Sequence, residues 1–187
     1  MNDLGSKSLE TDRLILRKFE KNDAEGIFLW ASNPNVTRFV SWNAYRNLQE
    51  AEIALSQWIK DYENGSYHWC IQLKETGDII GRISVVVHWR NHYCEVGFCY
   101  GEQYWHNGYA TEALIKVINF LLFECEFHTI EAKACSKNVG SVNVMKRAGM
   151  IKEAVLKERY FDEENNEYDD LICFFINREQ FNKGNNR

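Results

Sequence analysis

The stretch that decides the fold of this chain reads Gly97-Phe98-Cys99-Tyr100-Gly101-Glu102-Gln103-Tyr104-Trp105-His106-Asn107-Gly108-Tyr109-Ala110-Thr111-Glu112-Ala113. An apolar, β-rich segment precedes it, and a helical pattern follows it to about Phe123. The first amides of a helix have no acceptor within the helix, and the helix dipole adds partial positive charge there. A strand, a glycine-containing loop and a helix start in this order therefore predict an anion-binding site.

Two interpretations of this stretch are open when it is taken alone. In one, Gly108 lets the backbone approach a ligand, and the small Ala110 and Thr111 keep the first helical turn open. In the other, the stretch is an ordinary strand-to-helix connection whose glycines serve only the turn. No Lys or Arg occurs between Arg90 and Lys116, so backbone amides would have to supply most of the anion binding.

Length and composition predict one domain over residues 1–187, with residues 1–8 as a loose lead-in. The formal net charge is −5 and no long basic run occurs, so we expect no nucleic-acid partner. No apolar signal core is present at the N-terminus, and no run reaches membrane-spanning length. These features predict a cytoplasmic protein without a membrane partner.

The cysteines and histidines do not have the spacing of a disulfide framework or a metal site. The six cysteines contain no Cys-x-x-Cys pair, and five of them lie in apolar runs, where a thiol behaves as a small buried hydrophobe. The five histidines contain no helical i, i+4 pair. We therefore expect no metal, and we interpret the acidic run 162–167 as a solvated hairpin tip.

Hydrophobic periodicity predicts the element order βααβββαβαββ. Alternating residues from 67 to 100 indicate three strands of an antiparallel meander, and helical spacing after the quoted loop indicates a helix over 110–123. The predicted fold class is α/β (α+β), with a mixed, mostly antiparallel sheet and helices on both faces. The other expected strands are 14–19, 129–135, 152–161 and 168–176, and the other expected helices begin near 24, 47 and 139, with a break at 33–35.

The run Trp105-x-x-Gly108-Tyr109-Ala110-Thr111-Glu112-Ala113 resembles the acyl-CoA signature of the GNAT acetyltransferase superfamily. A second block, Asn138 to Met150, is similar to the Asn-x-x-Ser block of the branch that includes the Rim-type ribosomal-protein serine/alanine N-terminal acetyltransferases. Two blocks in the right order, about thirty residues apart, are far more specific than either alone. A weaker similarity extends from Leu9 to Asp169.

The resemblance implies acetyl-CoA as cosubstrate and a sheet that splays between the strand at 95–100 and the strand at 129–135. The pantetheine arm would enter the resulting slot, and the pyrophosphate would meet the helix start. The residues that the resemblance places at the cofactor are Phe98, Cys99, Tyr100, His106, Asn107, Gly108, Tyr109, Ala110, Thr111, Asn138 and Ser141.

Acyl transfer from a thioester to an amine needs a base for the amine, a donor for the oxyanion and stabilisation of the leaving thiolate. Glu95 is the candidate base, and a half-exposed, paired glutamate is an equally open interpretation. Ser141 would point its hydroxyl toward the sulfur, and its alternative role is helix packing. Glu112, in the first helical turn, favours a structural role.

Three residues depart from the family pattern. His106 stands where the family usually has Gly, which implies a backbone conformation that a bulky residue can adopt. Asn107 replaces the usual Lys or Arg and so removes a cation from the pyrophosphate. Met145 occupies the position of the tyrosine proton donor of many members, so Ser141, Tyr160 or water would have to substitute.

The leading hypothesis is an acetyl-CoA-dependent N-acetyltransferase that works by direct attack in a ternary complex. The expected acceptor is a protein N-terminal α-amine, as the branch that the sequence resembles suggests. Small amines such as a polyamine, an aminoglycoside or an amino acid form the alternative substrate class. A catalytically silent acyl-CoA-binding or sensing module is a further alternative, and a homodimer through the closing strands is compatible with the sequence.

Overall fold

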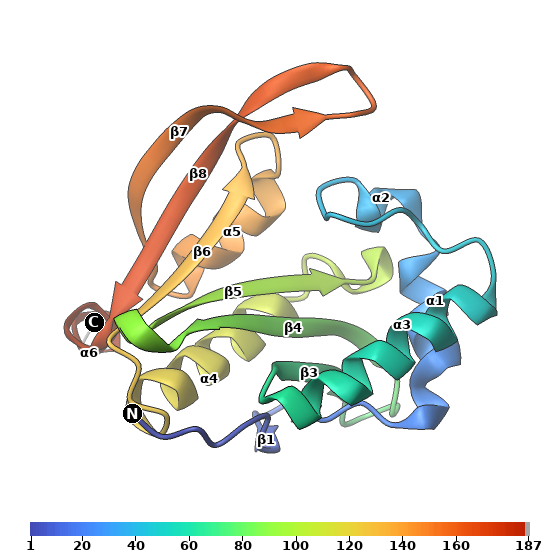
Figure 1. The fold of residues 1–187 in the computed structure, drawn as a ribbon, viewed down its shortest axis with the longest axis horizontal. Helices are drawn as coiled ribbons and strands as arrows, with labels where there is room; N and C mark the ends of the chain where they lie inside the picture. The colour runs from blue at the N-terminus through green and yellow to red at the C-terminus, as the bar shows by residue number, and fades with distance from the viewer. Residues whose placement is uncertain (186–187) are drawn as a thin grey trace.

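The computed structural model describes residues 1–185, which form an eight-stranded sheet with the order β1-β2-β3-β4-β5-β6-β8-β7 (Figure 1). Neighbouring strands pair antiparallel except β5 and β6, which are parallel. The strands are β1 (Leu9–Glu10), β2 (Leu14–Arg17), β3 (Tyr67–Leu73), β4 (Ile79–His88), β5 (Tyr93–Tyr100), β6 (Thr129–Cys135), β7 (Ile151–Asp162) and β8 (Glu167–Asn177). The helices are α1 (Ala24–Ala31), α2 (Pro34–Thr37), α3 (Leu48–Asp61), α4 (Tyr109–Phe123), α5 (Val139–Arg147) and α6 (Arg178–Asn185).

The predicted fold class is confirmed, and three short elements are additions to it. β1 pairs two residues with β2, which itself ends at Arg17 instead of residue 19. The expected break at 33–35 is the start of α2, because the Asn33 side chain accepts from Asn35 N and Pro34 occupies the first turn. α6 begins where Asn177 Oδ1 accepts from Glu179 N at 3.0 Å.

The sheet splays between β5 and β6, as the family resemblance implies. The two strands are in register only at Tyr93–Thr129, Cys94–Ile130 and Glu95–Glu131. Beyond these pairs β5 stays on β4 and β6 stays on β8. The β6-facing edge of β5 from residue 96 onward therefore has no strand partner, and the two strands diverge in Figure 1.

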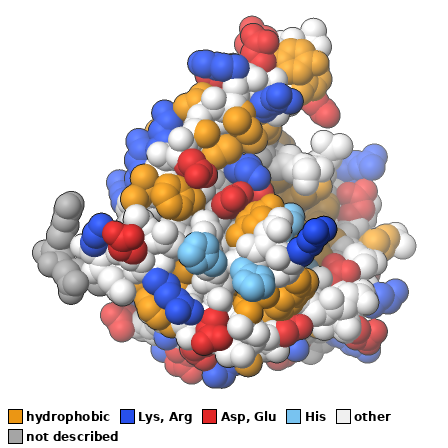
Figure 2. Space-filling view, turned by 60° about the vertical axis from the view of Figure 1, so that its left-hand side comes forward, with side chains coloured by type: hydrophobic (Ala, Val, Ile, Leu, Met, Phe, Trp, Pro, Cys, Tyr) orange, Lys and Arg blue, Asp and Glu red, His pale blue; other side chains and the backbone are white. Residues whose placement is uncertain are grey.

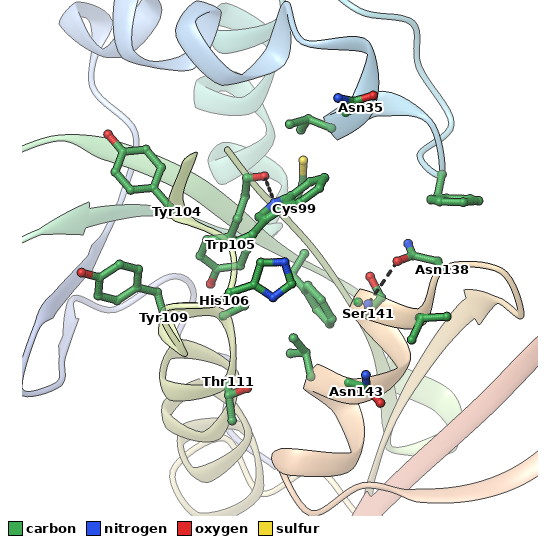
Figure 3. Close-up of a pocket in the computed structure, with 18 of the residues that line it drawn as sticks. Asn35, Cys99, Tyr104, Trp105, His106, Tyr109, Thr111, Asn138, Ser141 and Asn143 are labelled. Carbon is green, nitrogen blue, oxygen red and sulfur yellow. Dashed lines mark hydrogen bonds between the residues drawn. The ribbon is translucent and has the colours of Figure 1, made fainter. Parts of the chain in front are cut away.

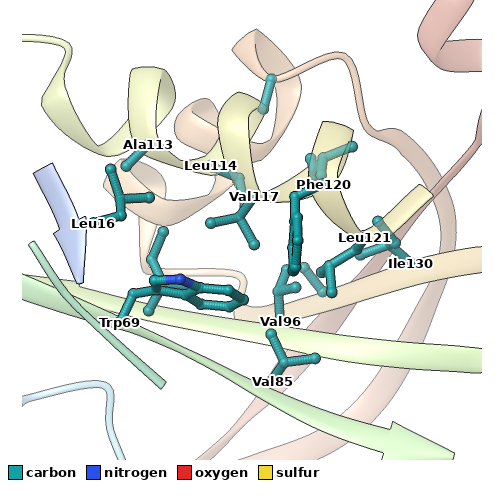
Figure 4. Packing of buried hydrophobic residues seen from close by; sticks show 14 of the residues in the cluster. Leu16, Trp69, Val85, Val96, Ala113, Leu114, Val117, Phe120, Leu121 and Ile130 are labelled. Carbon is teal, nitrogen blue, oxygen red and sulfur yellow. The ribbon is translucent and has the colours of Figure 1, made fainter. Parts of the chain in front are cut away.

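Helices cover both faces of the sheet, as predicted. α4 packs its apolar stripe, including Leu114 and Val117, on Trp69 and Val96 of the sheet (Figure 4). Phe120 meets Trp69 edge-on at 5.9 Å between ring centroids. α1 and α3 bury a second cluster on the opposite face, centred on Trp30 and Trp58. The splayed strands are thus held by two separate cores, each with large aromatic side chains.

The first residues of the chain differ from the loose lead-in expected from the sequence. Asn2 N donates to Cys125 O at 2.8 Å, and Trp69 Nε1 donates to Lys7 O at 2.8 Å. Ser6 is buried, and its hydroxyl accepts from His68 N at 2.8 Å. Residues 2–7 are therefore docked along β3 and the end of α4. The sequence did not reveal this, because the docking uses backbone groups.

The β7–β8 hairpin bends at a bulge in which residues 157–159 of β7 lie opposite Asp170 of β8. The Asp170 carboxylate accepts from Lys157 Nζ at 2.7 Å and from Glu158 N at 3.3 Å. Beyond the bend, Tyr160 donates its hydroxyl to Arg38 O at 3.1 Å. The hairpin therefore reaches across to the segment after α2, and in Figure 2 it overhangs a hollow.

The described residues give no indication of a metal cluster or a membrane-spanning helix. No group of three His, Cys, Asp or Glu side chains among them is placed to hold an ion. At the hairpin tip, Asp162 instead accepts from Glu164 N and Asn165 N. None of the helices within residues 1–185 is long and apolar enough to cross a bilayer. On the face shown in Figure 2, acidic and basic side chains are interspersed.

Candidate active site

A cavity of about 420 Å³ lies where β5 and β6 diverge, between the start of α4 and the start of α5. Figure 3 shows His106 and Thr111 on one side of it and Asn138, Ser141 and Asn143 on the other. We call this cavity the slot. Ten of the sequence-predicted site residues line it: Phe98, Cys99, Tyr100, His106, Gly108, Tyr109, Ala110, Thr111, Asn138 and Ser141.

The α4 end of the slot is formed by backbone amides. Among the described residues, the amides of 106–111 have no hydrogen-bond acceptor, and the first helical bond runs from Glu112 N to Gly108 O at 3.0 Å. Gly108 has φ of 82°, and His106 has φ of 62°. Consecutive N–H groups around left-handed residues at a helix start form an anion-binding concavity. His106 adopts a sparsely populated conformation there, despite the Cβ that the family's usual Gly lacks.

A cation that the local sequence does not contain lies at this end of the slot. Arg13, just before β2, donates from Nη1 to Asn107 O at 3.0 Å, and its guanidinium lies 4.4 Å from the centre of the Tyr109 ring. A Cβ on Gly108 would lie 3.5 Å from Arg13 Nη2. The expectation that the loop has no cation nearby is therefore incomplete. Only the pairing of β2 with β3 brings Arg13 to α4.

Glu112 fixes Arg13 in place and has the structural role expected for it. Its carboxylate accepts from Thr11 Oγ1 at 2.6 Å and from Arg13 Nε at 2.7 Å. Burial raises the pKa of Glu112, but the hydrogen bonds from Thr11 and Arg13 outweigh it and leave the pKa lowered. Glu112 therefore ties the N-terminus of α4 to the strand that precedes β3.

Asn107 is the one predicted cofactor residue that does not line the slot. Its side chain donates from Nδ2 to Trp105 O at 2.9 Å, and its carbonyl accepts from Arg13. Trp105 in turn donates from Nε1 to Tyr100 O at 2.7 Å, as Figure 3 shows. The Asn107 side chain therefore stabilises the loop, and its backbone N–H is one of those without an acceptor among the described residues.

The α5 side of the slot begins with Asn138, whose Oδ1 accepts from Ser141 N at 3.1 Å. This N-cap leaves the side-chain nitrogen Nδ2 of Asn138 and the hydroxyl of Ser141 available at the slot. Met145, one turn further on, is 1% exposed and packs in the core instead of lining the slot. The position of the family's tyrosine donor therefore faces inward, and Ser141 is the hydroxyl that α5 presents.

Glu95 lies outside the slot lining, at the fork where β5 and β6 separate. It is in register with Glu131, and Lys133 Nζ lies 2.5 Å from the Glu95 carboxylate and 3.8 Å from that of Glu131. The hydrogen bond to Glu95 raises the pKa of Lys133. Two carboxylates directly opposite each other would repel, so Lys133 stabilises the fork. The Glu95 side chain remains 35% exposed.

Cys99 is the one sulfur nucleophile in the slot lining. Burial raises the pKa of its thiol to about 12, and the charge of Arg82 opposes this shift only in part. A thiol with this pKa is protonated near neutral pH and is a weak nucleophile. The arrangement therefore disfavours an acyl-cysteine intermediate and is compatible with direct attack by an amine.

The far end of the slot contains residues that the sequence did not single out. Asn35, Val36, Phe39 and Val40 line it from α2 and the loop after it. No Asp or Glu occurs among the lining residues of the described chain, whereas Lys137 and Arg147 do. Tyr160, the rival donor, does not line the slot, because its hydroxyl is bound to Arg38 O. No local motif marks α2 as part of a site, so only the fold identifies it.

Comparison with known proteins decides the family. Residues 13–151 match a family model described as "Acetyltransferase (GNAT) domain". The chain belongs to the GNAT family. It is 31% identical over 170 residues to the uncharacterized N-acetyltransferase YoaA of Bacillus subtilis, covering 90% of this chain and 96% of that protein. The expected N-acetyltransferase is thereby confirmed at the level of the family.

Solved GNAT structures share the fold at low identity. A ribosomal-protein-serine acetyltransferase from Vibrio cholerae aligns with a TM-score of 0.77 and 21% identity, over 91% of this chain and 97% of that one. The microcin C7 self-immunity acetyltransferase, solved with acetyl-CoA and AMP, aligns with a TM-score of 0.78 and 20% identity, over 89% and 93%. These likenesses confirm the fold, and they leave the acceptor open.

Proposed function

We propose that this GNAT N-acetyltransferase transfers the acetyl group of acetyl-CoA to a primary amine by direct attack within a ternary complex. The observation that carries the proposal is the row of unpaired amides at 106–111 facing the Ser141 hydroxyl across one slot. The amides and Arg13 suit a pyrophosphate, and the unpaired edge of β5 suits the amides of a pantetheine arm. Bound acetyl-CoA would supply an acetyl thioester, whose C–S bond breaks as the new C–N bond forms.

Each protein group has one task in this proposal. Glu95 accepts, through water, the proton that the amine loses, since its carboxylate lies at the fork outside the slot lining. A backbone N–H on the unpaired edge of β5, at Phe98 or Tyr100, holds the thioester oxygen. Ser141 donates a hydrogen bond to the departing sulfur, and this bond strengthens as negative charge develops. Asn138 would orient the pantetheine with its free amide nitrogen.

The acceptor that the slot fits best is a protein N-terminal α-amine. A polyamine or an aminoglycoside carries several positive charges, and such ligands need carboxylates around them. The lining has none among the described residues, and it contains Arg147 and also Lys137, which is paired with Asp169 at 3.0 Å just outside the lining. An α-amine followed by a neutral or anionic chain does not meet this repulsion. A single amino acid remains the small-molecule alternative, because it too has one α-amine and no further positive charge.

Release of CoA, followed in the presence of different amines, tests the function. We expect release to depend on N-terminal peptides and to remain at background with spermidine or an aminoglycoside. Release with the polycations alone would overturn the acceptor assignment. Tight acetyl-CoA binding, measured by calorimetry, without turnover of any amine would favour the catalytically silent binding module. The inward-facing Met145 is the observation that supports this alternative.

Two further expectations accompany this function as proposals. β7 is the edge strand beside β8, and its outer side has no partner among residues 1–185, so a homodimer would form there. Sedimentation at several concentrations checks this. A cytoplasmic location, where acetyl-CoA is available, is the second proposal, and fractionation of cells that express the protein tests it.

A further inference from the structure

Arg82 is a half-buried cation one strand away from the slot. It lies on β4, on the face covered by α1 and α3, directly opposite Cys99 of β5 and Cys70 of β3. Cys99 lines the slot near its α2 end. Arg82 keeps part of its surface accessible to solvent, although it lies deep between the sheet and α3. Its guanidinium is therefore placed beside the region where an acceptor would enter.

The guanidinium of Arg82 has no ionic partner among the described residues. No carboxylate lies within ion-pair distance of it, and none of its N–H groups makes a hydrogen bond there; its close contact is the Trp58 ring, at 4.2 Å from the centroid. Burial lowers the pKa of Arg82, and the charge of Asp61 is the weakest of the opposing influences. Asp61 is engaged elsewhere, because it accepts from Gln57 Nε2 at 2.7 Å.

A second arginine of the sheet shows that the chain can pair such a cation. Arg17 on β2 donates to both oxygens of Asp23 at 2.8 Å and donates from Nε to Gln72 Oε1 at 3.0 Å. A half-buried arginine is stabilised by such a partner, since a charge partly withdrawn from water is costly when it is unpaired. Arg82 is the exception, and the aromatic ring of Trp58 leaves its N–H fork free.

A neighbouring group on the same face, His68, is only partly paired, since its Nε2 lies 3.8 Å from Asp61 Oδ2. His68 of β3 is in register with Ser84, two residues along β4 from Arg82, and its Nδ1 is buried without a hydrogen bond. Burial, and then the charge of Arg82, lower the pKa of His68 to about 4, so the ring is neutral near pH 7. Two polar side chains with unused hydrogen-bonding capacity thus lie together between the sheet and α3.

We propose that Arg82 is the binding residue for an anionic group, a carboxylate or a phosphate, carried by the acceptor amine. The inference rests on the proposed function of the slot and narrows its substrate class. The guanidinium fork matches two oxygens of such a group. Its position opposite Cys99, which lines the slot, places the guanidinium next to the β5 wall of the slot. The absence of carboxylates from the slot lining suits an acceptor of this charge.

The first test observes Arg82 directly and needs no turnover. The Nε–Hε signal of Arg82 is followed by nuclear magnetic resonance and assigned from its loss in Arg82→Lys. Inorganic phosphate and acetate are then added to the wild-type protein. We expect a saturable shift of the Arg82 signal with at least one of them, and no shift of the Arg17 signal, whose fork is already filled by Asp23. An Arg82 signal unchanged at saturating anion would overturn the proposal.

The second test measures acceptor preference with matched pairs: O-phosphoserine and serine, β-alanine and its amide, and the peptide amides Ser-Glu and Ser-Gln. We expect the wild type to prefer the anionic member of a pair at least tenfold in kcat/KM. In Arg82→Gln this ratio should fall to near one, with acetyl-CoA affinity unchanged. Comparison of the phosphate pair with the carboxylate pairs identifies which anionic group Arg82 binds. An equal loss for both members of every pair would mean a structural role and overturn the proposal.

The two tests separate this inference from the function on which it rests. If no amine is acetylated but the Arg82 signal still shifts with anion, the acetyltransferase proposal fails and the anion site stands. If peptides are acetylated without regard to charge and the signal does not shift, the function stands and the anion site fails. Should Arg82→Gln not fold, the shift in the wild-type protein and the charge-preserving Arg82→Lys variant still decide the question.

Discussion

The two ends of the slot are built in different ways. The α4 end consists of consecutive backbone amides, residues 106–111, from one continuous segment of chain. The α2 end consists of side chains from segments far apart in sequence, such as Val36 and Phe98, with Arg82 beside them. Backbone amides offer the same groups whatever the side chains are, whereas an acceptor site depends on which side chains the fold assembles. A common cosubstrate suits the first kind of site, and an enzyme-specific acceptor suits the second.

The fork between β5 and β6 lies outside the slot lining and gives the largest expected effect. If Glu95 is the base, Glu95→Gln should lower kcat by about 10²- to 10⁴-fold with little change in acetyl-CoA affinity. Steady-state kinetics and calorimetry measure the two quantities. Glu131→Gln is the matched control, because Glu131 lies opposite Glu95 and shares Lys133. Equal losses in both variants would make the pair a structural support of the fork and place the base elsewhere.

The backbone character of the α4 end is tested at Gly108. A Cβ there meets only Arg13 Nη2 at an ordinary 3.5 Å, so strain at φ 82° is the larger cost of substitution. Gly108→Val should weaken acetyl-CoA binding by about 1–3 kcal/mol, which is about 5- to 150-fold in Kd. Gly65→Val is the matched control, because Gly65 has φ of 73° and lies away from the slot. Unchanged binding in a folded Gly108→Val protein would contradict the anion site.

Ser141 and Tyr160 are the two candidate hydrogen-bond donors to the leaving sulfur, and mutation of each tests which one acts. Ser141→Ala should lower kcat by about ten- to a hundredfold, since a hydrogen bond to a charged group contributes about 1.5–3 kcal/mol. Tyr160→Phe should have the smaller effect, because its hydroxyl already donates to Arg38 O and lies outside the slot lining. Pre-steady-state measurement of CoA release separates this chemical step from binding. The reverse ranking would move the donor to the β7–β8 hairpin.

The two ends also differ in how far they could be predicted. The strands at 67–73, 79–88 and 93–100 and the loop before α4 follow from alternation and from glycine spacing, both of which are local. The splay required the family resemblance, because three paired residues between β5 and β6 leave no periodic trace. The sequence does not assign Arg13, Arg82 and α2 to the site, since Glu112 holds Arg13, strand pairing places Arg82, and no local motif marks α2. Pro34 was interpreted as a break, although a helix can begin at proline.

His106 has a bulky side chain at the α4 end of the slot, where the backbone amide is the group expected to bind the cosubstrate. Its φ of 62° costs about 1–2 kcal/mol relative to the right-handed regions, and Gly relieves this strain. The greater freedom of Gly in the unfolded chain offsets about 0.4–1 kcal/mol of that relief. His106→Gly should therefore stabilise the fold by up to about 1 kcal/mol, or about 2–4 °C in Tm, measured by thermal unfolding. His92→Gly, at φ 57° on the other end of β5, should give a similar gain. Acetyl-CoA affinity should stay within a fewfold of wild type in both. A large loss of affinity in His106→Gly alone would show that the imidazole, and not only its backbone amide, binds the cosubstrate.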